Sequence, residues 1–400
     1  MKPCSPPTWR IVRFSDVVRN VKVHVDPETS GLERYIAGEH METDNLHIHQ
    51  SGTIGDGYLG PAFHRKFVKG QVLYGSRRTY LRKVAVTEFD GICANTTFVL
   101  DAKEDVLLQE LLPFIMQTEG FTQHSILHSK GSVNPYVNWK DIACYEFPLP
   151  PLDEQRRIAG VLWAADAAVT RFEDTLEQLA ALKRSALTEW TTRGLKASHR
   201  KQTQIGNIPS HWRLAKVGEL LEICQYGLSI RAENDGQYPI LRMMNIEDGL
   251  IVPNDLRYVN LSDADFANFR VEPGDILFNR TNSADLVGKV GISLLEGDYV
   301  FASYLVRLRV KRNLVSPEYL NYYLNSPLGQ RRILSYATPG VSQTNINANN
   351  LQRVLVPLPP RDEQEAIVEN LRQINASKKA ILHQLERLRE VKSRLLSKLL

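Results

Sequence analysis

The chain has 400 residues, of which 43% are hydrophobic and 24% charged, as is ordinary for a globular protein of two or three domains. Its net charge is only +4, so a surface for a polyanion would need local clustering of cations. No run approaches the ~18 apolar residues of a membrane span, and residues 1–13 lack the apolar core of a secretory signal. The cysteines are Cys4, Cys93, Cys144 and Cys224. They form no CxxC pair, so we expect reduced thiols and a cytoplasmic protein without zinc or disulfides.

Residues 1–150 are expected to form a domain that mixes strands and helices. Short β-branched runs at residues 84–86 and 96–100 predict strands, and the pattern at residues 110–116 predicts a helix. A strand at residues 70–74 is followed by a cation-rich loop, and a second polar loop follows further along the chain. The candidate binding residues of these two loops are Arg77, Arg78, Tyr80, Arg82, Lys83, Lys130 and Asn134.

Residues 151–194 are expected to form one long helix. The consecutive prolines of PLPPLDEQRRI (residues 148–158) cannot lie inside a helix, and the carboxylates that follow favour its first turn. Apolar residues then recur in steps of four and three, the a/d pattern of a helix that packs on another helix. About 38 residues at 1.5 Å each span roughly 57 Å, which indicates a spacer. The predicted seam residues are Ile158, Leu162, Phe172, Leu176 and Leu179.

A polar, basic linker at residues 195–208 precedes a second copy of the domain at residues 209–357. The run PSHWR (residues 209–213) corresponds to PPTWR (residues 6–10) at an offset of 203. The offset between matched residues rises to 209 along the domain, so the second copy gains six residues between its strands, where surface loops diverge. The predicted elements are strands at residues 290–293 and 304–310 and a helix at residues 317–324.

Both polar loops recur in the second copy. The strand at residues 274–278 is again followed by arginine and amide side chains, and a second glycine-led polar loop lies near residue 340. Guanidinium groups bind phosphate or guanine and amides pair with adenine, so recurrence at one position favours a DNA-binding surface. A solvated charge run, or a glycine turn leading into Ile142 and Leu351, is the alternative. The candidates are Arg280, Asn282, Lys289, Gln343 and Asn345.

Residues 358–400 are expected to repeat the long helix. PLPPRDEQEAI (residues 357–367) matches residues 148–158 at 8 of 11 positions with an offset of 209, and the match continues without a gap. The predicted seam residues are Ile367, Leu371, Ile381, Leu385 and Leu388.

Two equivalent lysines, Lys183 and Lys392, fall on the same step of the two seams. They either fix the register of the helices or mark a drift of the seam, and drift is the favoured interpretation because a 3.6-residue helix departs from a 3.5-residue repeat. The residues toward which the seam would drift are Leu182, Leu187, Val391 and Leu396.

Signatures of catalysis are mostly missing. The sequence has no GxxxxGK[ST] phosphate loop and no glycine-rich cofactor loop after a strand. Asp275 and Glu88 are lone carboxylates without a recognisable nuclease spacing. His47, His49 and His64 would suit a metal, but the second copy does not repeat them, so a solvated or DNA-facing pair is expected instead.

The doubled PLPPxDEQ run with its heptad helix, together with IPxxW (residues 208–212), resembles the specificity (S) subunit of type I restriction–modification systems. The similarity covers essentially the whole chain. It implies an α+β fold in which two pseudo-repeated mixed α/β target-recognition domains are joined by two long antiparallel coiled-coil helices. Each domain would read one half of a split target in double-stranded DNA.

The resemblance also implies a division of labour. This chain would have no active site, metal or cofactor and no contact with a membrane. Methyltransferase (M) subunits, expected to number two, would carry S-adenosylmethionine, and restriction/motor (R) subunits would use ATP and Mg²⁺. A specificity module of another modification or defence assembly, and a coiled-coil scaffold whose domains bind protein, are the rival interpretations. Salt-dependent binding to duplex DNA separates the scaffold from the other two.

Overall fold

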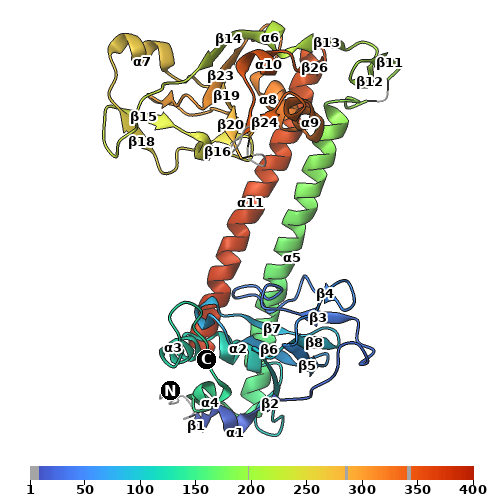
Figure 1. Ribbon diagram of the computed structural model, residues 1–400, viewed down its shortest axis with the longest axis vertical. Coiled ribbons are helices and arrows are strands. Elements are labelled where there is room, and N and C mark those ends of the chain that lie inside the picture. Colours follow the sequence, from blue (N-terminus) through green and yellow to red (C-terminus); the bar gives the residue numbers. More distant parts are fainter. Residues whose placement is uncertain (1–8, 197, 284–286, 340–343) are drawn as a thin grey trace, which may run out of the picture. The chain divides into compact units, whose positions relative to one another are not determined.

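The computed structural model describes residues 9–196, 198–283, 287–339 and 344–400. The chain divides into two compact units, one with residues 1–173 and 383–400 and the other with residues 174–382. Each unit holds one mixed α/β domain and segments of the same two long helices (Figure 1). No helix among the described residues is long and apolar enough to span a bilayer. The two sequence repeats thus fold as two α/β domains, as predicted.

The domain of unit 1 is built on two four-stranded sheets. The order of the first is β2-β9-β6-β7, antiparallel throughout, and that of the second is β4-β3-β8-β5, with β3 parallel to β8. The strands are β2 (Val18–Val21), β3 (Arg34–Ile36), β4 (Gly52–Thr53), β5 (Phe63–Phe67), β6 (Val72–Gly75), β7 (Val84–Val86), β8 (Gly91–Ala94) and β9 (Thr97–Ala102). The helices are α1 (Phe14–Val17), η1 (Thr79–Leu81), α2 (Leu112–Gln117), α3 (Glu119–Leu127) and α4 (Trp139–Ala143).

The domain of unit 2 repeats this plan with additions. The strands β14-β23-β19-β21 correspond to β2-β9-β6-β7 and continue into β17 and β16, and the parallel pair β15 and β22 corresponds to β3 and β8. The strands are β14 (Leu221–Tyr226), β15 (Tyr238–Leu241), β16 (Ile246–Glu247), β17 (Leu250–Ile251), β18 (Arg257–Val259), β19 (Ile276–Asn279), β21 (Val290–Ile292), β22 (Val300–Phe301) and β23 (Leu305–Val310). The helices are α6 (Val217–Leu220), η2 (Met243–Asn245), α7 (Asp263–Phe269), α8 (Pro317–Asn325), α9 (Pro327–Leu334) and α10 (Ala348–Gln352).

The central strand of each domain is buried on both faces. In β6, Val72 and Tyr74 face one apolar cluster while Leu73 faces another, as the two-residue period of a strand requires. In β19, Ile276 and Phe278 likewise lie in one cluster and Leu277 in a second. Both predicted glycine-led strands are therefore core strands, and the loops that follow them leave from a rigid base.

Each domain begins and ends in one two-stranded ribbon. In unit 1, β1 (Arg10–Arg13) pairs with β10 (Glu146–Leu149) in antiparallel register. In unit 2, β13 (Arg213–Lys216) pairs with β26 (Leu355–Leu358) in the same way. The second strand of each ribbon runs directly into the prolines that precede a long helix.

The long helices are α5 (Leu152–Trp190) and α11 (Arg361–Leu399). In unit 1 the start of α5 shares an apolar cluster with the end of α11, and in unit 2 the end of α5 shares one with the start of α11. The helices therefore pack antiparallel within each unit, as predicted. Predicted seam residues that are buried are Ile158, Leu162, Ile367, Leu371 and Leu385; those that are half-buried are Phe172, Leu176, Leu179, Ile381 and Leu388.

The glutamine of the PLPPxDEQ run fastens each long helix to its domain. The buried Gln155 accepts the Leu108 N–H at 2.9 Å and donates to the carbonyls of Val106 and Pro150 at 2.8 and 2.9 Å. Its side chain thus satisfies three backbone groups at the point where the helix begins.

The equivalent Gln364 repeats these contacts in unit 2. It accepts the Ser316 N–H at 2.8 Å and donates to the carbonyls of Leu314 and Pro359 at 3.3 and 3.0 Å. The same clamp in both copies explains why a glutamine follows the acidic residues of the run.

The seam drifts only in part: Leu187 is buried and Leu396 packs against an apolar cluster, but the two lysines stay on the seam in place of Leu182 and Val391. Leu182 is 54% exposed and Val391 is 48% exposed, whereas the side chains of Lys183 and Lys392 are only 13% and 14% exposed. Lys392 forms an ion pair with Asp166 of α5, and Lys183 forms one with Asp248 of the turn between β16 and β17.

The stretch predicted as a linker contains regular structure. β11 (Arg200–Thr203) and β12 (Gly206–Pro209) form an antiparallel hairpin, and Ile208 is buried in the apolar core of unit 2. The polar composition of the strands concealed this hairpin, because its described core contacts are limited to Ile208 and Pro209 in β12 and Ile205 in the turn.

Candidate nucleic-acid interface

The two polar loops of the first copy lie side by side. Arg77 in the loop after β6 forms an antiparallel bridge with Tyr136, and Lys130 bridges to the same residue. The Arg78 N–H donates to the Pro135 carbonyl at 2.6 Å. Backbone hydrogen bonds therefore join two segments that are more than fifty residues apart in the sequence.

The second copy makes the same join. β20 (Thr281–Asn282) pairs antiparallel with β25 (Thr344–Asn345), and β24 (Thr338–Pro339) pairs with β25 from the other side. The Ile346 N–H donates to the Arg280 carbonyl at 2.8 Å. Two loops that recur in sequence thus form one paired surface in each domain.

Five predicted residues of the first copy are exposed on this surface: Arg77, Arg78, Tyr80, Lys130 and Asn134. Arg78 has a φ of 49°, a left-handed conformation that is strained for a residue with a side chain. Among the described residues, no ion pair engages the side chain of Arg77 or Arg78. Both guanidinium groups are therefore available to a partner.

Arg82 and Lys83 are held inside the domain. The Arg82 guanidinium lies 2.7 Å from an Asp44 oxygen and 3.3 Å from a Glu119 oxygen. The Lys83 ammonium donates to the Gly38 carbonyl at 2.5 Å. These two predicted residues stabilise the loop rather than face outward.

Lys130 is also engaged, since its ammonium lies 3.0 Å from both oxygens of Asp141. Burial opposes ionisation of Asp141, but hydrogen bonds from Asn138 and Lys130 outweigh it and lower its pKa. The lysine therefore fixes the second loop to the start of α4.

Arg280 dominates the surface of the second copy. Its guanidinium lies 4.9 Å above the ring of Tyr226, and its Nε donates to the Ser303 carbonyl at 3.0 Å. The Tyr226 hydroxyl accepts the Ala348 N–H at 2.9 Å, which holds the ring in place. Tyr226 was not predicted from the sequence, although an aromatic residue at the end of a strand near a recurrent arginine could have indicated it.

The remaining candidates of the second copy differ in exposure. The Asn282 amide contacts the Met243 sulfur at 3.0 Å, and Asn345 is half-buried within β25. Lys289 is exposed at the far end of the same loop, where its carbonyl accepts the Asn279 N–H. Gln343 lies outside the described residues.

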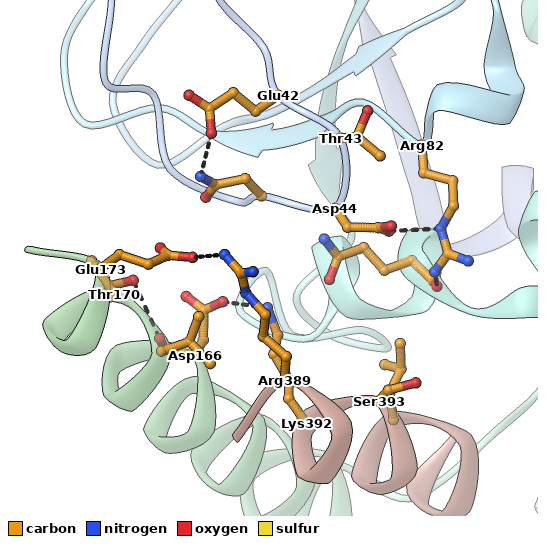
Figure 2. A pocket seen from close by; sticks show the side chains of 14 residues that line it. Glu42, Thr43, Asp44, Arg82, Asp166, Thr170, Glu173, Arg389, Lys392 and Ser393 are labelled. Atoms are coloured by element: carbon orange, nitrogen blue, oxygen red, sulfur yellow. Dashed lines mark hydrogen bonds and ion pairs between the residues drawn. The ribbon is translucent and has the colours of Figure 1, made fainter. Parts of the chain in front are cut away.

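A cavity of about 490 Å³ in unit 1 lies between the residue 42–45 loop and the long helices (Figure 2). Its cations are paired with acids that also line it. The Arg389 guanidinium lies 2.6 Å from a Glu173 oxygen, and the Lys392 ammonium donates to Asp166. Because each of these cations is already paired with an acid of the cavity, the cavity does not indicate a charged ligand.

His47 contacts α5 at Asp166, one of the residues that line this cavity. Its Nε2 donates to Asp166, which is 3% exposed, at 2.7 Å. This hydrogen bond raises the pKa of His47 against the opposing effect of burial. Burial opposes ionisation of Asp166, but His47 and Lys392 outweigh it and lower its pKa. His47 is therefore neither solvated nor facing DNA, as had been expected, and it anchors the domain to α5.

In unit 2 the charges of the equivalent contact are reversed, because the loop supplies an acid and the long helices supply the cations. Asp248 and Gly249 form the two-residue turn between β16 and β17, with φ of 46° and 82°. Asp248 lies 3.0 Å from the Lys183 ammonium and 2.8 Å from that of Lys378. Burial opposes ionisation of Asp248, but these lysines lower its pKa.

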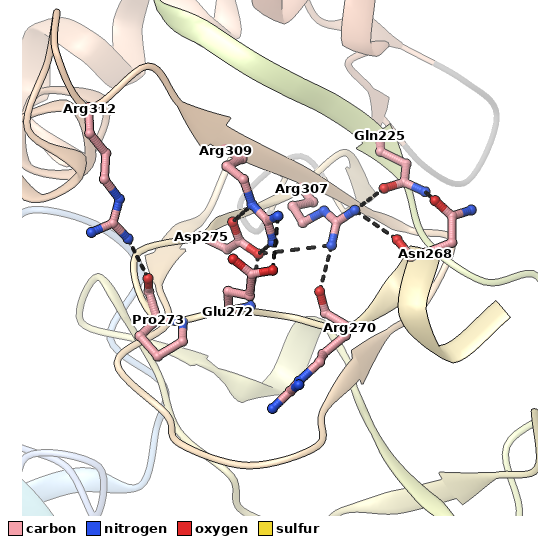
Figure 3. A network of polar contacts seen from close by, with 9 residues as sticks. All are labelled: Gln225, Asn268, Arg270, Glu272, Pro273, Asp275, Arg307, Arg309 and Arg312. Carbon is pink, nitrogen blue, oxygen red and sulfur yellow. Dashed lines mark hydrogen bonds and ion pairs between the residues drawn. The ribbon is translucent and has the colours of Figure 1, made fainter. Parts of the chain in front are cut away.

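A buried polar network lies in the sheet of the second domain (Figure 3). Asp275 is 1% exposed and accepts two hydrogen bonds of 2.8 Å from Arg309. Arg307 donates to Gln225 and to the Arg270 carbonyl. Asp275 is thus a structural ion-pair partner and not a catalytic carboxylate.

The corresponding network of the first domain contains no arginine. Gln71 and Asp101 occupy the positions of Asp275 and Arg309 and form a single hydrogen bond of 3.0 Å. Val21 and Val99 occupy the positions of Gln225 and Arg307 and lie opposite each other in the sheet. The two domains therefore share a backbone but differ in side chains near the candidate surface.

Among the described residues, no group of three or more histidine, cysteine or acidic side chains is placed to hold a metal ion. Burial raises the pKa of the Cys93 thiol to about 12 and that of Cys224 to about 11, so neither thiol is ionised at neutral pH.

Comparisons with known proteins agree on one family. The model of the type I restriction modification DNA specificity domain matches residues 41–181 and 209–388. The putative type I restriction enzyme MjaX specificity subunit of Methanocaldococcus jannaschii is 35% identical over 205 residues, which cover 50% of this chain and 48% of that protein. The MjaVIII specificity subunit of the same organism is 24% identical over 92% of this chain and 87% of its own length. The match to the MjaX subunit thus spans about half of that relative.

A solved structure agrees with the fold. A chain from a study of the assembly and conformational transition of the type I R-M system has a TM-score of 0.61 and 22% identity, and the match covers 98% of each chain. This similarity supports the α+β architecture along the whole chain.

Proposed function

The chain belongs to the type I restriction-modification DNA specificity family, and from this premise we propose that it reads a bipartite, asymmetric DNA target, one half-site per domain. The supporting observation is that the same two polar loops are paired in both copies but carry different side chains. Arg78 and Tyr80 are exposed on this surface in the first domain, whereas the second domain presents Arg280 stacked on Tyr226. Like scaffolds with unlike contacts give two different half-sites.

The chain supplies recognition and no catalysis in this proposal. Two methyltransferase subunits dock on it and provide S-adenosylmethionine chemistry, and restriction subunits provide ATP- and Mg²⁺-dependent cleavage. The similarity to specificity subunits of type I restriction enzymes supports this division.

The long helices set the unread gap between the half-sites. Each has 39 residues, which at 1.5 Å per residue is roughly 58 Å of helix. The clamps of Gln155 and Gln364 fix where each helix leaves its domain. Covalent connection also raises the effective concentration of the second domain once the first is bound.

Methylome sequencing of host cells with and without this chain tests the proposal. We expect one methylated bipartite motif that disappears when the gene is deleted and returns with a plasmid copy. An unchanged methylome, combined with duplex binding by the purified assembly that ignores salt and sequence, would instead support the protein-binding scaffold.

A further inference from the structure

A second cleft in unit 1, of about 320 Å³, lies beside the candidate surface of the first domain. It is lined by the end of β2, by β5, by the turn between β8 and β9 and by both polar loops. The lining residues that matter here are Asn20, Lys22, Arg65, Arg77, Asn95 and Tyr136. Three of these six are cations, and no described aspartate or glutamate lines the cleft.

Arg65 is the unusual member of this group. It is only 8% exposed, and its Nη1 donates to the Thr97 carbonyl at 2.7 Å. Its Nε is buried without a hydrogen-bond partner in the part of the chain that the structure describes, as is the Oδ1 of Asn20. Buried guanidinium groups are ordinarily paired with a carboxylate, because an uncompensated buried charge is costly.

Nothing described in the domain compensates this charge. Among the described residues no carboxylate forms an ion pair with Arg65, Lys22 or Arg77. The nearby Cys93 cannot do so either, since burial raises the pKa of its thiol to about 12 and leaves it neutral. The self-paired cavity of Figure 2 shows the contrast, because there each lining cation has an acid opposite it.

In the second domain a guanidinium group also lies at the turn equivalent to that between β8 and β9, but it comes from a different segment of the chain. The register of β2 with β9 and of β14 with β23 places Tyr226 at the position of Lys22. There Arg280 covers Tyr226 and donates to the Ser303 carbonyl, and Ser303 corresponds to Asn95. The turn thus receives an arginine in both domains, from β5 in one and from the recurrent loop in the other.

We propose that this cleft binds a phosphate group of the DNA backbone next to the first half-site. The inference rests on the proposed function and adds to it a site that positions the duplex without reading bases. Arg65 supplies a fixed buried charge, and the exposed Lys22 and Arg77 close on the phosphate from the rim. The exposed ring of Tyr136 lies where it can contact the neighbouring sugar.

Charge-removing variants of the two rim residues test the site. Lys22→Gln and Arg77→Gln are assembled with the methyltransferase subunits of the same system, and binding to duplex is measured between 50 and 300 mM salt. Lys69→Gln is the matched control, because Lys69 is exposed before β6, at the opposite end of that strand from Arg77. Arg65→Gln is added where its thermal unfolding shows that it folds.

Each rim variant is expected to bind about tenfold more weakly on cognate and scrambled duplexes alike. The slope of log affinity against log salt is expected to fall by about 0.9 for each lost contact. The control keeps the wild-type affinity and slope. A duplex that carries a neutral methylphosphonate at the contacted position is expected to bind wild type and variant equally.

Three outcomes would overturn the inference while leaving the proposed function in place. One is an unchanged salt slope in the variants. Another is a change of sequence preference without general weakening, which would make the cleft a base-reading site. The third is stabilisation of the wild type by inorganic phosphate without any coupling to the methylphosphonate position, which would indicate free phosphate as the ligand. If wild-type binding itself ignores both salt and sequence, the proposed function fails with it.

Discussion

Charged side chains near the candidate surface divide into those paired within the chain and those left for a partner. Arg82, Lys83 and Lys130 have partners, and Arg77 and Arg78 are exposed without an ion pair among the described residues. The sequence shows where cations are dense but not which ones are paired. Pairing depends on acids such as Asp44, Glu119 and Asp141, which the fold brings together from distant segments.

The contact of His47 with Asp166 makes the stability of unit 1 depend on pH. The pKa of His47 is raised in the fold, so its contribution is complete below the ordinary value near 6.5 and is lost as pH rises through the raised value. The pKa of Asp166 is lowered, so its contribution is present above the ordinary value near 3.8 and is lost as pH falls through the lowered value. The contact is therefore strongest between these two ordinary values.

Asp166→Asn is expected to destabilise the protein by about 3 kcal/mol near pH 5.5 and by less near pH 8.5, because the charge of His47 is lost as pH rises while Lys392 remains paired with the carboxylate. Thermal unfolding at the two pH values measures the difference. His47→Gln is the control, because its own loss of stability should be confined to the lower pH. A cost of Asp166→Asn that is the same at both values would contradict the proposed pairing.

Arg280→Ala is expected to weaken discrimination of one half-site by about 1–3 kcal/mol and to leave the other half-site unchanged. The reason is that Arg280 and the Tyr226 ring on which it stacks both belong to the second domain, which reads one half-site in the proposal. Methylome sequencing of the variant measures the change as relaxed bases in one half of the motif. Arg270→Ala, which removes an exposed ion pair with Asp298, should leave the motif intact. Relaxation of both halves would argue against one half-site per domain.

At the scale of elements, strong local signals predicted more than composition did. The proline pairs and the four–three spacing located both long helices, and the glycine-led runs located β6 and β19. The hairpin of β11 and β12 was missed because its strands are polar. The cleft around Arg65 was missed because five separate segments build it, and no local pattern shows that they meet.

The glutamine clamp is an element-scale feature that can be tested directly. Gln364→Ala removes an acceptor for the Ser316 N–H and a donor for two carbonyls at a buried position, which is expected to cost about 2–3 kcal/mol. Denaturant unfolding measures the loss. Gln373→Ala on the exposed face of α11 is the matched control, with an expected effect within about 0.5 kcal/mol. Equal effects of the two variants would refute the clamp.

At the scale of the whole molecule, two like domains are combined with two like helices. If the helices set the unread gap, its length depends on their residue number and not on loop sequence. Deletion of seven residues from α5 and of the seven equivalent residues from α11 removes about 10 Å, or roughly three base pairs. Seven residues are close to two helical turns, so the seam residues stay on the same face.

The shortened chain is expected to methylate the same two half-sites with a gap about three base pairs shorter. Methylome sequencing measures both features in one experiment. A matched chain with seven residues exchanged for others of the same pattern, and none deleted, should keep the original gap. An original gap in the shortened chain would refute the spacer role of the helices.

The ribbons formed by β1 with β10 and by β13 with β26 have an evolutionary consequence. Because each domain enters and leaves through adjacent strands, a change of loop length inside it does not move the residue at which the following helix starts. The six residues gained by the second copy were accommodated in this way. Recognition can therefore diversify by insertion and deletion, which usually disrupt a fold, while the helical frame is inherited unchanged.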